Sequence, residues 1–130
     1  MNPLSGTILV VDDDPDIREV LRDRLESLGC RVLLAPSGKE GLELLEKQSP
    51  QMVLLDIEMP GMNGLEVLKE IRRREIDVTV VMITAYGTIE RAVQAMKQGA
   101  YDFISKPFEP DHIALTVQKA LEREKLKRGV

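Results

Sequence analysis

The chain has 130 residues, of which 43% are hydrophobic and 31% are charged, as expected for one globular domain with an ordinary core. Its net charge of -4 argues against a nucleic-acid interface, which needs a basic patch. No apolar stretch approaches the roughly 18 residues of a membrane span, and the first residues lack a signal-peptide pattern. The single cysteine, Cys30, excludes an internal disulfide and is typical of a reducing compartment, so we expect a cytoplasmic protein.

Strand-like and helix-like segments alternate five times along the chain. The strand-like segments are short and rich in β-branched and aliphatic residues. They cover residues 7–11, 30–35, 51–55, 78–83 and 101–104. The first helix follows an Asp14-Pro15 start signal and ends at Gly29, and Ser37 and Asn63 open the second and third. The fourth helix is expected at about 88–98 and the fifth at 110–127.

Five consecutive βα units favour a parallel sheet with right-handed crossovers and helices on both faces. We therefore expect an α/β protein with the flavodoxin-like (βα)5 three-layer sandwich, whose five-stranded sheet has the order 2-1-3-4-5. Residues 7–121 would form this domain, after a tail at 1–6, and 122–130 would begin a helical linker or form a C-terminal tail. In this strand order the ligand-binding switch point lies between the first and third strands.

Acidic residues follow the two strands that meet at this switch point. Asp12, Asp13 and Asp14 come directly after the first strand, and Asp56 ends the third apolar run. At an effective dielectric of ~20, carboxylates ~4 Å apart repel by roughly 4 kcal/mol, so the cluster needs a proton or a cation. Carboxylates at a partly open rim suit Mg²⁺. The competing interpretation, acidic capping of the first helix, explains Asp14 but not Asp56.

Four motifs in order give the chain a clear family resemblance. They are 10–15 (VVDDDP), 55–64 (LDIEMPGMNG), 83–85 (ITA) and 105–108 (SKPF). Together they resemble the receiver domain of bacterial two-component response regulators over residues 7–121. Residues 92–104 further resemble receivers of the nitrogen-regulatory, enhancer-binding activators.

The resemblance implies a role for each motif residue. Asp56 would accept a phosphoryl group from the phosphohistidine of a sensor histidine kinase, and Lys106 would neutralise charge on that group. The same resemblance implies that Thr84 bonds a phosphoryl oxygen and that Phe103 is the aromatic switch residue whose rotamer follows it. It also implies a Mg²⁺ site whose ligands are Asp12, Asp13, Asp56 and the backbone carbonyl of Glu58.

Each of these residues also has a simpler interpretation. Thr84 could end a strand, Phe103 could be ordinary core, and Lys106 could be a solvated loop residue. A cis bond before Pro107 would aim the Lys106 side chain inward. We expect Glu58 and Tyr86 to flank the cleft. His112, the sole histidine, is expected at the surface, so the chain offers no histidine phosphodonor.

Two other functions share this fold or chemistry. A phosphatase of the haloacid-dehalogenase class would need a second aspartate two residues after Asp56, where the chain has Glu58. A flavin-binding module would need a phosphate-binding loop after the first strand, where the acidic run would repel a phosphate. We therefore expect a phosphoacceptor that catalyses its own phosphorylation and dephosphorylation, not a turnover enzyme.

The fourth and fifth helices carry more apolar positions than one core-facing stripe needs. These positions are Ile89, Ala92, Val93, Met96, Ile113 and Val117. We expect a homodimer through the face formed by the fourth helix, fifth strand and fifth helix, extended by residues 121–126. This face would control an output, which in the resembled activators is transcription.

Overall fold

The computed structural model describes residues 6–85 and 89–127. Five parallel strands form one sheet in the order β2-β1-β3-β4-β5, which confirms the predicted flavodoxin-like architecture. Their bounds are β1 Thr7–Val11, β2 Arg31–Ala35, β3 Met52–Asp56, β4 Thr79–Thr84 and β5 Asp102–Ser105. Because β1 pairs with both β2 and β3, the direction in which successive strands are added reverses at the β1/β3 boundary, which is the position where open parallel sheets bind ligands.

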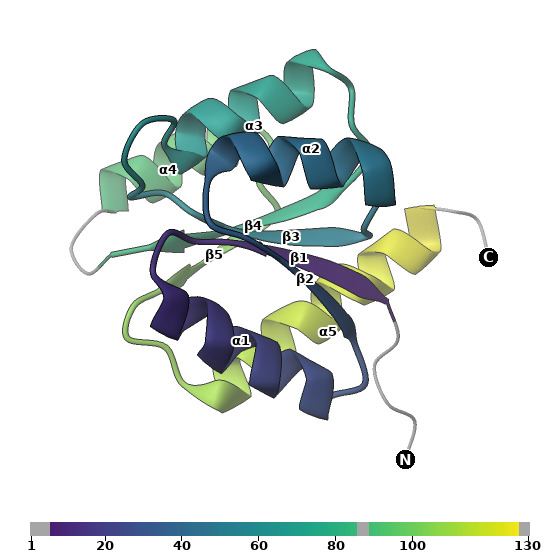
Figure 1. Cartoon of the computed structure of the whole chain (residues 1–130). Coiled ribbons are helices and arrows are strands. Elements are labelled where there is room, and N and C mark those ends of the chain that lie inside the picture. Colours follow the sequence, from purple (N-terminus) through teal and green to yellow (C-terminus); the bar gives the residue numbers. More distant parts are fainter. Residues whose placement is uncertain (1–5, 86–88, 128–130) are drawn as a thin grey trace.

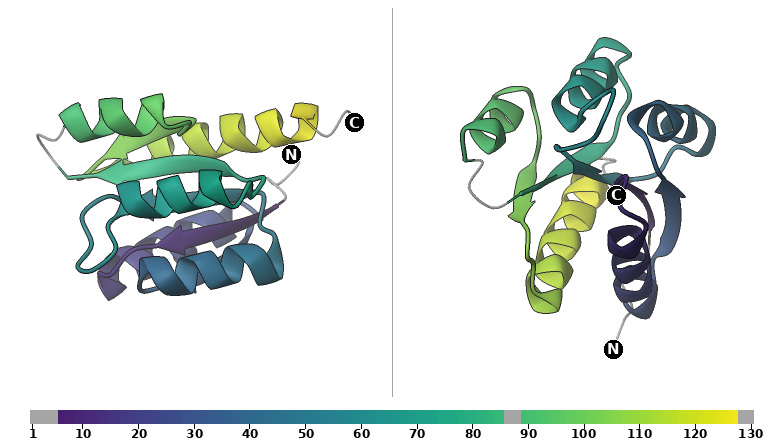
Figure 2. Two further views of the ribbon diagram at one scale, coloured as in Figure 1. Left: turned by 90° about the horizontal axis from the view of Figure 1, so that it is seen from above. Right: turned by 60° about the vertical axis from the view of Figure 1, so that its left-hand side comes forward.

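Five helices cover the two faces of the sheet. They are α1 Pro15–Ser27, α2 Gly38–Gln48, α3 Gly64–Arg73, α4 Ile89–Lys97 and α5 Pro110–Lys127. Helices α1 and α5 lie on one face, while α2, α3 and α4 lie on the other (Figure 1). The two side views in Figure 2 show the same three layers. No helix among the described residues is long and apolar enough to cross a bilayer.

The central strands divide their side chains between two cores. Leu9 and Val11 of β1 pack in the core beneath α2, α3 and α4, whereas Ile8 and Val10 pack in the core against α1 and α5. This alternation follows from the two-residue period of a strand. Because both faces are covered, residues 8–11 of β1 are a continuous apolar run rather than an alternating one, and the acidic Asp12 follows directly at the carboxyl end.

Local signals place the helix starts as the sequence predicts. The Asp14 side chain accepts a hydrogen bond from Asp16 N and caps α1. Asn63 and Glu66 form a reciprocal capping box at the start of α3, which satisfies two backbone donors that a helix start leaves without partners.

Strand boundaries differ from the sequence prediction by one residue. Strand β2 begins at Arg31, while β3 and β4 extend to Asp56 and Thr84. Both polar residues are within the ladder, where Asp56 is in register with Ile83 and Thr84 with Ser105. Sheet pairing therefore fixes the backbone of both residues, so the position of each Cα atom does not depend on the conformation of the following loop.

We predict that Gly64→Ala destabilises the protein because a Cβ there would lie 2.3 Å from the Asp56 carbonyl oxygen. Alanine normally stabilises a helix by about 1 kcal/mol over glycine, yet here we expect a loss of about 1–3 kcal/mol from overpacking. Urea unfolding measures the change. Lys69→Ala, on the exposed side of α3, is the control, and a gain in stability for Gly64→Ala would contradict the prediction.

Candidate functional site

Three carboxylates meet where β1 and β3 end. Asp12 and Asp56 are buried, with 0% and 1% of their surfaces exposed, and Asp13 lies at the open side. Each of the three offers an oxygen within 4.8 Å of the others. The sequence predicted this convergence, because the carboxyl ends of adjacent parallel strands lie at the same edge of a sheet.

The turn between β1 and α1 is held by its own polar groups. Asp12 Oδ1 accepts a hydrogen bond from Asp14 N at 2.9 Å. Arg18, one turn into α1, donates from Nη1 to the Asp12 carbonyl oxygen at 2.7 Å. The turn therefore fixes the direction in which the Asp12 carboxylate leaves the strand.

Lys106 reaches the acidic cluster from the end of β5. Its Nζ lies 3.3 Å from Asp12 Oδ2 and 3.6 Å from Asp56 Oδ1, and the Lys106–Pro107 peptide bond is cis. Asp12 Oδ2 is buried and makes no hydrogen bond to any described residue, so its contact with Nζ is an ion pair without hydrogen-bond geometry. One ammonium therefore faces two buried carboxylates.

The imbalance of charge changes the acidity of Asp56. Burial raises the pKa of Asp56 to about 7, and the Asp12 carboxylate, followed by Asp13, adds to the rise. The Lys106 ammonium and the hydrogen bond from Glu58 N to Asp56 Oδ1 (3.2 Å) act against it. The protein alone thus leaves part of this negative charge uncompensated. Buried carboxylate oxygens with such an excess fit a hard divalent cation of the Mg²⁺ type.

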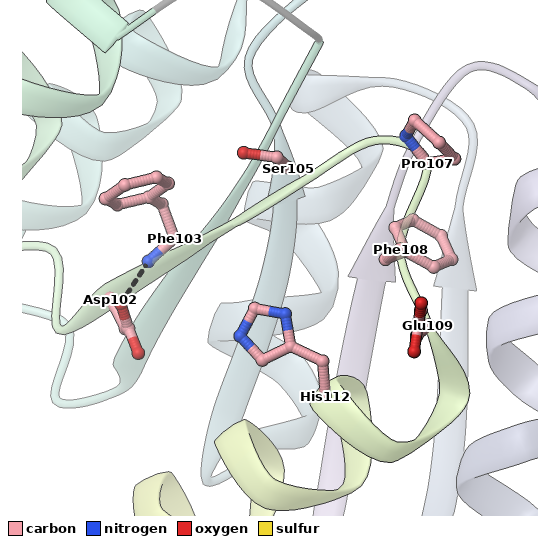
Figure 3. A pocket seen from close by; sticks show the side chains of 7 residues that line it. All are labelled: Asp102, Phe103, Ser105, Pro107, Phe108, Glu109 and His112. Atoms are coloured by element: carbon pink, nitrogen blue, oxygen red, sulfur yellow. Dashed lines mark hydrogen bonds between the residues drawn. The ribbon is translucent and has the colours of Figure 1, made fainter.

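Thr84 and Phe103 lie beside this cluster on β4 and β5. Thr84 is 2% exposed, its Oγ1 is 3.4 Å from the Ala85 carbonyl oxygen, and its own carbonyl accepts from Lys106 N at 2.9 Å. Phe103 is half-buried and lines a cavity of about 580 Å³ beside β5 and the start of α5 (Figure 3). The Phe103 ring packs against the core beneath α2, α3 and α4.

The side chain of Glu58 turns away from the acidic cluster. Its Oε2 forms an ion pair with Nη1 of Arg91 on α4 at 2.7 Å. Tyr86, expected on the opposite flank, lies outside the described residues, as does Thr88. His112 is exposed as predicted and lines the same cavity as Phe103 (Figure 3).

Sequence reasoning missed two arginines at this end of the sheet, Arg18 and Arg91. Arg18 follows the α1 cap residue Asp14 by four positions, and this spacing is the signal that could have found it, since it places the side chain over the first turn. Arg91 carried no comparable signal, because its partner is 33 residues away (91 − 58).

Comparison with known proteins decides between the functions that the fold allows. A family model of the response regulator receiver domain matches residues 8–118. The chain belongs to this family. The match spans the acidic cluster, Lys106 and Thr84, and it favours a receiver domain over the phosphatase and flavin-binding alternatives.

The relatives of this receiver domain are larger regulatory proteins. Nitrogen assimilation regulatory protein NtrX from Azorhizobium caulinodans is 42% identical over 129 residues, which are 98% of this chain and 28% of that protein. Regulatory protein AtoC from Escherichia coli is 38% identical over 95% of this chain and 27% of that protein. The chain therefore spans about a quarter of the length of these relatives.

Solved structures agree with the fold. A crystal structure of NtrX from Brucella abortus in complex with ADP has a TM-score of 0.91 and 41% identity, over 97% of this chain and 29% of that one. The isolated receiver domain of that protein gives a TM-score of 0.85 at 41% identity, and the match covers 98% of its length. The relatives are activators of the NtrC type, which confirms the predicted subfamily.

We predict that the stability of the metal-free protein falls as pH rises from about 4 to about 7. The pKa of Asp56 rises from 3.8 to about 7 on folding, so the folded state binds more protons than the unfolded state in this window. Asp56→Asn should remove most of this slope and, above pH 7, stabilise the protein by at least about 1 kcal/mol. Denaturant unfolding without metal at several pH values measures both effects.

The control for this prediction is Asp23→Asn, an exposed substitution on α1 that should leave the slope unchanged. If Asp56→Asn keeps the wild-type slope, the Asp56 carboxyl group is not the source of the pH dependence. A loss of stability comparable to a core truncation would instead show that this carboxylate is structural.

Proposed function

We propose that this receiver domain accepts a phosphoryl group on Asp56 from the phosphohistidine of a sensor histidine kinase and thereby controls an output. The observation that carries the proposal is the buried Asp56 carboxylate beside Asp12, Asp13 and the Lys106 ammonium. An Asp56 oxygen forms the new bond to phosphorus while the phosphorus–nitrogen bond of the donor breaks, and the imidazole leaves. The product is an aspartyl phosphate.

Electrostatics and positioning supply most of the catalysis in phosphoryl transfer. The contacts of Asp56 support this, because the hydrogen bond from Glu58 N to Asp56 Oδ1 orients the carboxylate before the donor arrives. The Lys106 ammonium faces the same oxygen and would neutralise charge on the transferred group. Its ion pair with Asp12 keeps the ammonium at the rim when no phosphoryl group is present.

The acidic residues would hold Mg²⁺ during this transfer. We assign Asp12, Asp13 and Asp56 as its ligands on the basis of the clustered oxygens and the uncompensated charge. The resemblance to receiver domains adds the backbone carbonyl of Glu58 as a further ligand. The ion would supply positive charge that stabilises phosphoryl oxygens. The Arg18 hydrogen bond to the Asp12 carbonyl would keep the first of these ligands in place.

Thr84 and Phe103 would transmit the modification. The Thr84 hydroxyl is at the end of β4, one strand from Asp56, and would bond a phosphoryl oxygen. Movement of Thr84 frees space that the Phe103 ring would enter. The modification would thereby favour one of two pre-existing arrangements of α4, β5 and α5.

The output would be transcription, because the relatives include DNA-binding transcriptional regulators. Such an output implies a cytoplasmic protein and a following segment connected through residues 122–130.

The buried hydrogen bond from Thr79 Oγ1 to Glu124 Oε1, at 2.5 Å, holds the last described turns of α5 on the sheet. We infer that the domain catalyses its own phosphorylation and dephosphorylation and is not a turnover enzyme.

The homodimer would form through α4, β5 and α5. Val93 and Met96 on α4 and Leu115 on α5 are 46%, 42% and 50% exposed, and Leu126 is 78% exposed. Of the other positions expected at this face, Ala92, Ile113 and Val117 are buried in the cores, and the side chain of Ile89 lies outside the described set. The exposed residues therefore define a smaller apolar surface than the sequence predicted.

We predict that phosphoryl acceptance requires the Asp56 carboxylate and Mg²⁺. Asp56→Asn keeps the shape and the acceptor for Glu58 N but removes the anionic nucleophile, so incubation with acetyl phosphate should modify the wild type and leave the variant unmodified. Intact-protein mass spectrometry measures the modification. Equal labelling of the variant would assign the phosphoryl group to another residue.

Asp13→Asn is the companion variant, since it removes a ligand charge but not the nucleophile. We expect weaker Mg²⁺ binding, by tenfold or more, as measured by calorimetry, with unfolding close to that of the wild type. An unchanged Mg²⁺ affinity would remove Asp13 from the ligand set.

We also predict that the phosphoryl mimic beryllofluoride strengthens dimerisation. A coupling of about 1–3 kcal/mol corresponds to a 5- to 150-fold change in affinity, which sedimentation equilibrium can measure. Val93→Glu should abolish the dimer, whereas Val20→Glu, a similar change at an exposed position of α1, should not. A protein that stays monomeric with and without beryllofluoride at tens of micromolar would refute the dimer.

A further inference from the structure

Helix α4 is held to the sheet by smaller side chains than its neighbour α3. Among the α4 side chains that the structure describes, from Glu90 to Lys97, the buried ones are Ala92 and Ala95. Helix α3 instead buries Val67, Leu68 and Ile71. Burial of a large aliphatic side chain stabilises a protein more than burial of an alanine methyl group, because it removes more apolar surface from water. Apolar packing therefore fixes the position of α4 only weakly, and polar contacts have a larger share in deciding it.

Two polar contacts hold the two ends of α4. Near its C-terminal end, Arg72 of α3 donates from Nη2 to the Gly99 carbonyl oxygen at 2.8 Å. Near its N-terminal end, Arg91 Nη1 is 2.7 Å from Glu58 Oε2. The first contact joins α4 to the helix beside it (Figure 1). The second joins α4 to the loop that carries the phosphoacceptor.

The loop partner, Glu58, is in direct contact with Asp56. Its backbone N–H donates to Asp56 Oδ1, while its side chain reaches Arg91. One residue thus connects the carboxylate that would be modified with the helix that would move. This connection includes neither Thr84 nor Phe103, so it is separate from the switch on β4 and β5.

We propose that Arg91 is a positioning residue, which through its ion pair with Glu58 holds α4 in the arrangement of the unmodified protein. The inference rests on the proposed phosphoacceptor function. Because the pair favours the unmodified arrangement, loss of the pair lowers the free energy needed to reach the modified one. Both side chains are partly exposed, 46% and 40%, so the pair has a modest strength and can be broken during signalling.

The test is the affinity for beryllofluoride, measured by calorimetry on the whole chain with saturating Mg²⁺. Arg91→Gln and Glu58→Gln should each tighten binding two- to fivefold, which corresponds to about 0.4–1 kcal/mol. The double variant should bind no tighter than either single variant, because both remove the same interaction. The charge-reversed pair Glu58→Arg with Arg91→Glu should return the affinity toward that of the wild type.

The Glu58–Arg91 ion pair, as a tether that holds α4, is distinguished from direct attraction of charges to the ligand by the signs of the two single effects. Direct attraction to an anion would make Arg91→Gln weaken binding and Glu58→Gln strengthen it. If the ion pair is a tether, both substitutions remove it and both strengthen beryllofluoride binding. Opposite signs, or additive effects in the double variant, would overturn the proposal. Glu90→Gln and Lys97→Gln, which make the same charge changes at exposed positions of α4, are the matched controls and should shift the affinity less than twofold.

Amide hydrogen exchange provides a second readout that does not depend on the ligand. In the unmodified protein, exchange of the α4 amides should be faster in Arg91→Gln than in Lys97→Gln, while exchange in α3 should be unchanged. Equal protection of α4 in both variants would overturn the tether. If beryllofluoride does not bind the wild type at all, the phosphoacceptor function fails, and the exchange data still test the tether.

Discussion

The structure depends most on the close approach of three carboxylates at the β1/β3 boundary. Strand pairing forces the ends of these strands together, so Asp12 and Asp56 are buried side by side although their charges repel. A single ammonium, from Lys106, faces them both. The raised pKa of Asp56 is the consequence. The protein retains at this point an electrostatic cost that a bound cation would relieve.

The rest of the fold makes this cost tolerable. Both faces of the sheet carry a continuous core, and the strands end in ladder positions that sheet pairing fixes. Local hydrogen bonds to the Asp12 side chain and carbonyl, the second from Arg18, hold the β1–α1 turn in place. A rigid frame therefore holds an unfavourable cluster of charges, which is the arrangement expected where function opposes stability.

The helices are anchored to the sheet unequally, and α4, which the proposed signal would move, has, among the described residues, the smallest buried side chains of helices α1 to α4. Helices α1, α2 and α3 bury leucine, valine or isoleucine side chains, whereas α4 buries alanines and exposes Val93 and Met96. Of the two polar contacts that hold α4, the ion pair of Arg91 with Glu58 reaches the phosphoacceptor loop, while the hydrogen bond from Arg72 to the Gly99 carbonyl joins the other end to α3. A change of charge at Asp56 would thus act on a helix that apolar packing fixes only weakly.

The sequence by itself determined the five βα units, the strand order and the acidic cluster, because short apolar runs, helix caps and strand-end aspartates are local signals that one topology brings together. Strand ends were off by one residue, since ladder pairing extends β3 and β4 through Asp56 and Thr84. Only the tertiary structure decided the partner of Arg91 and which apolar residues of α4 and α5 reach solvent. Long flexible side chains and shared helix faces take their direction from neighbours distant in sequence, so no local pattern encodes them.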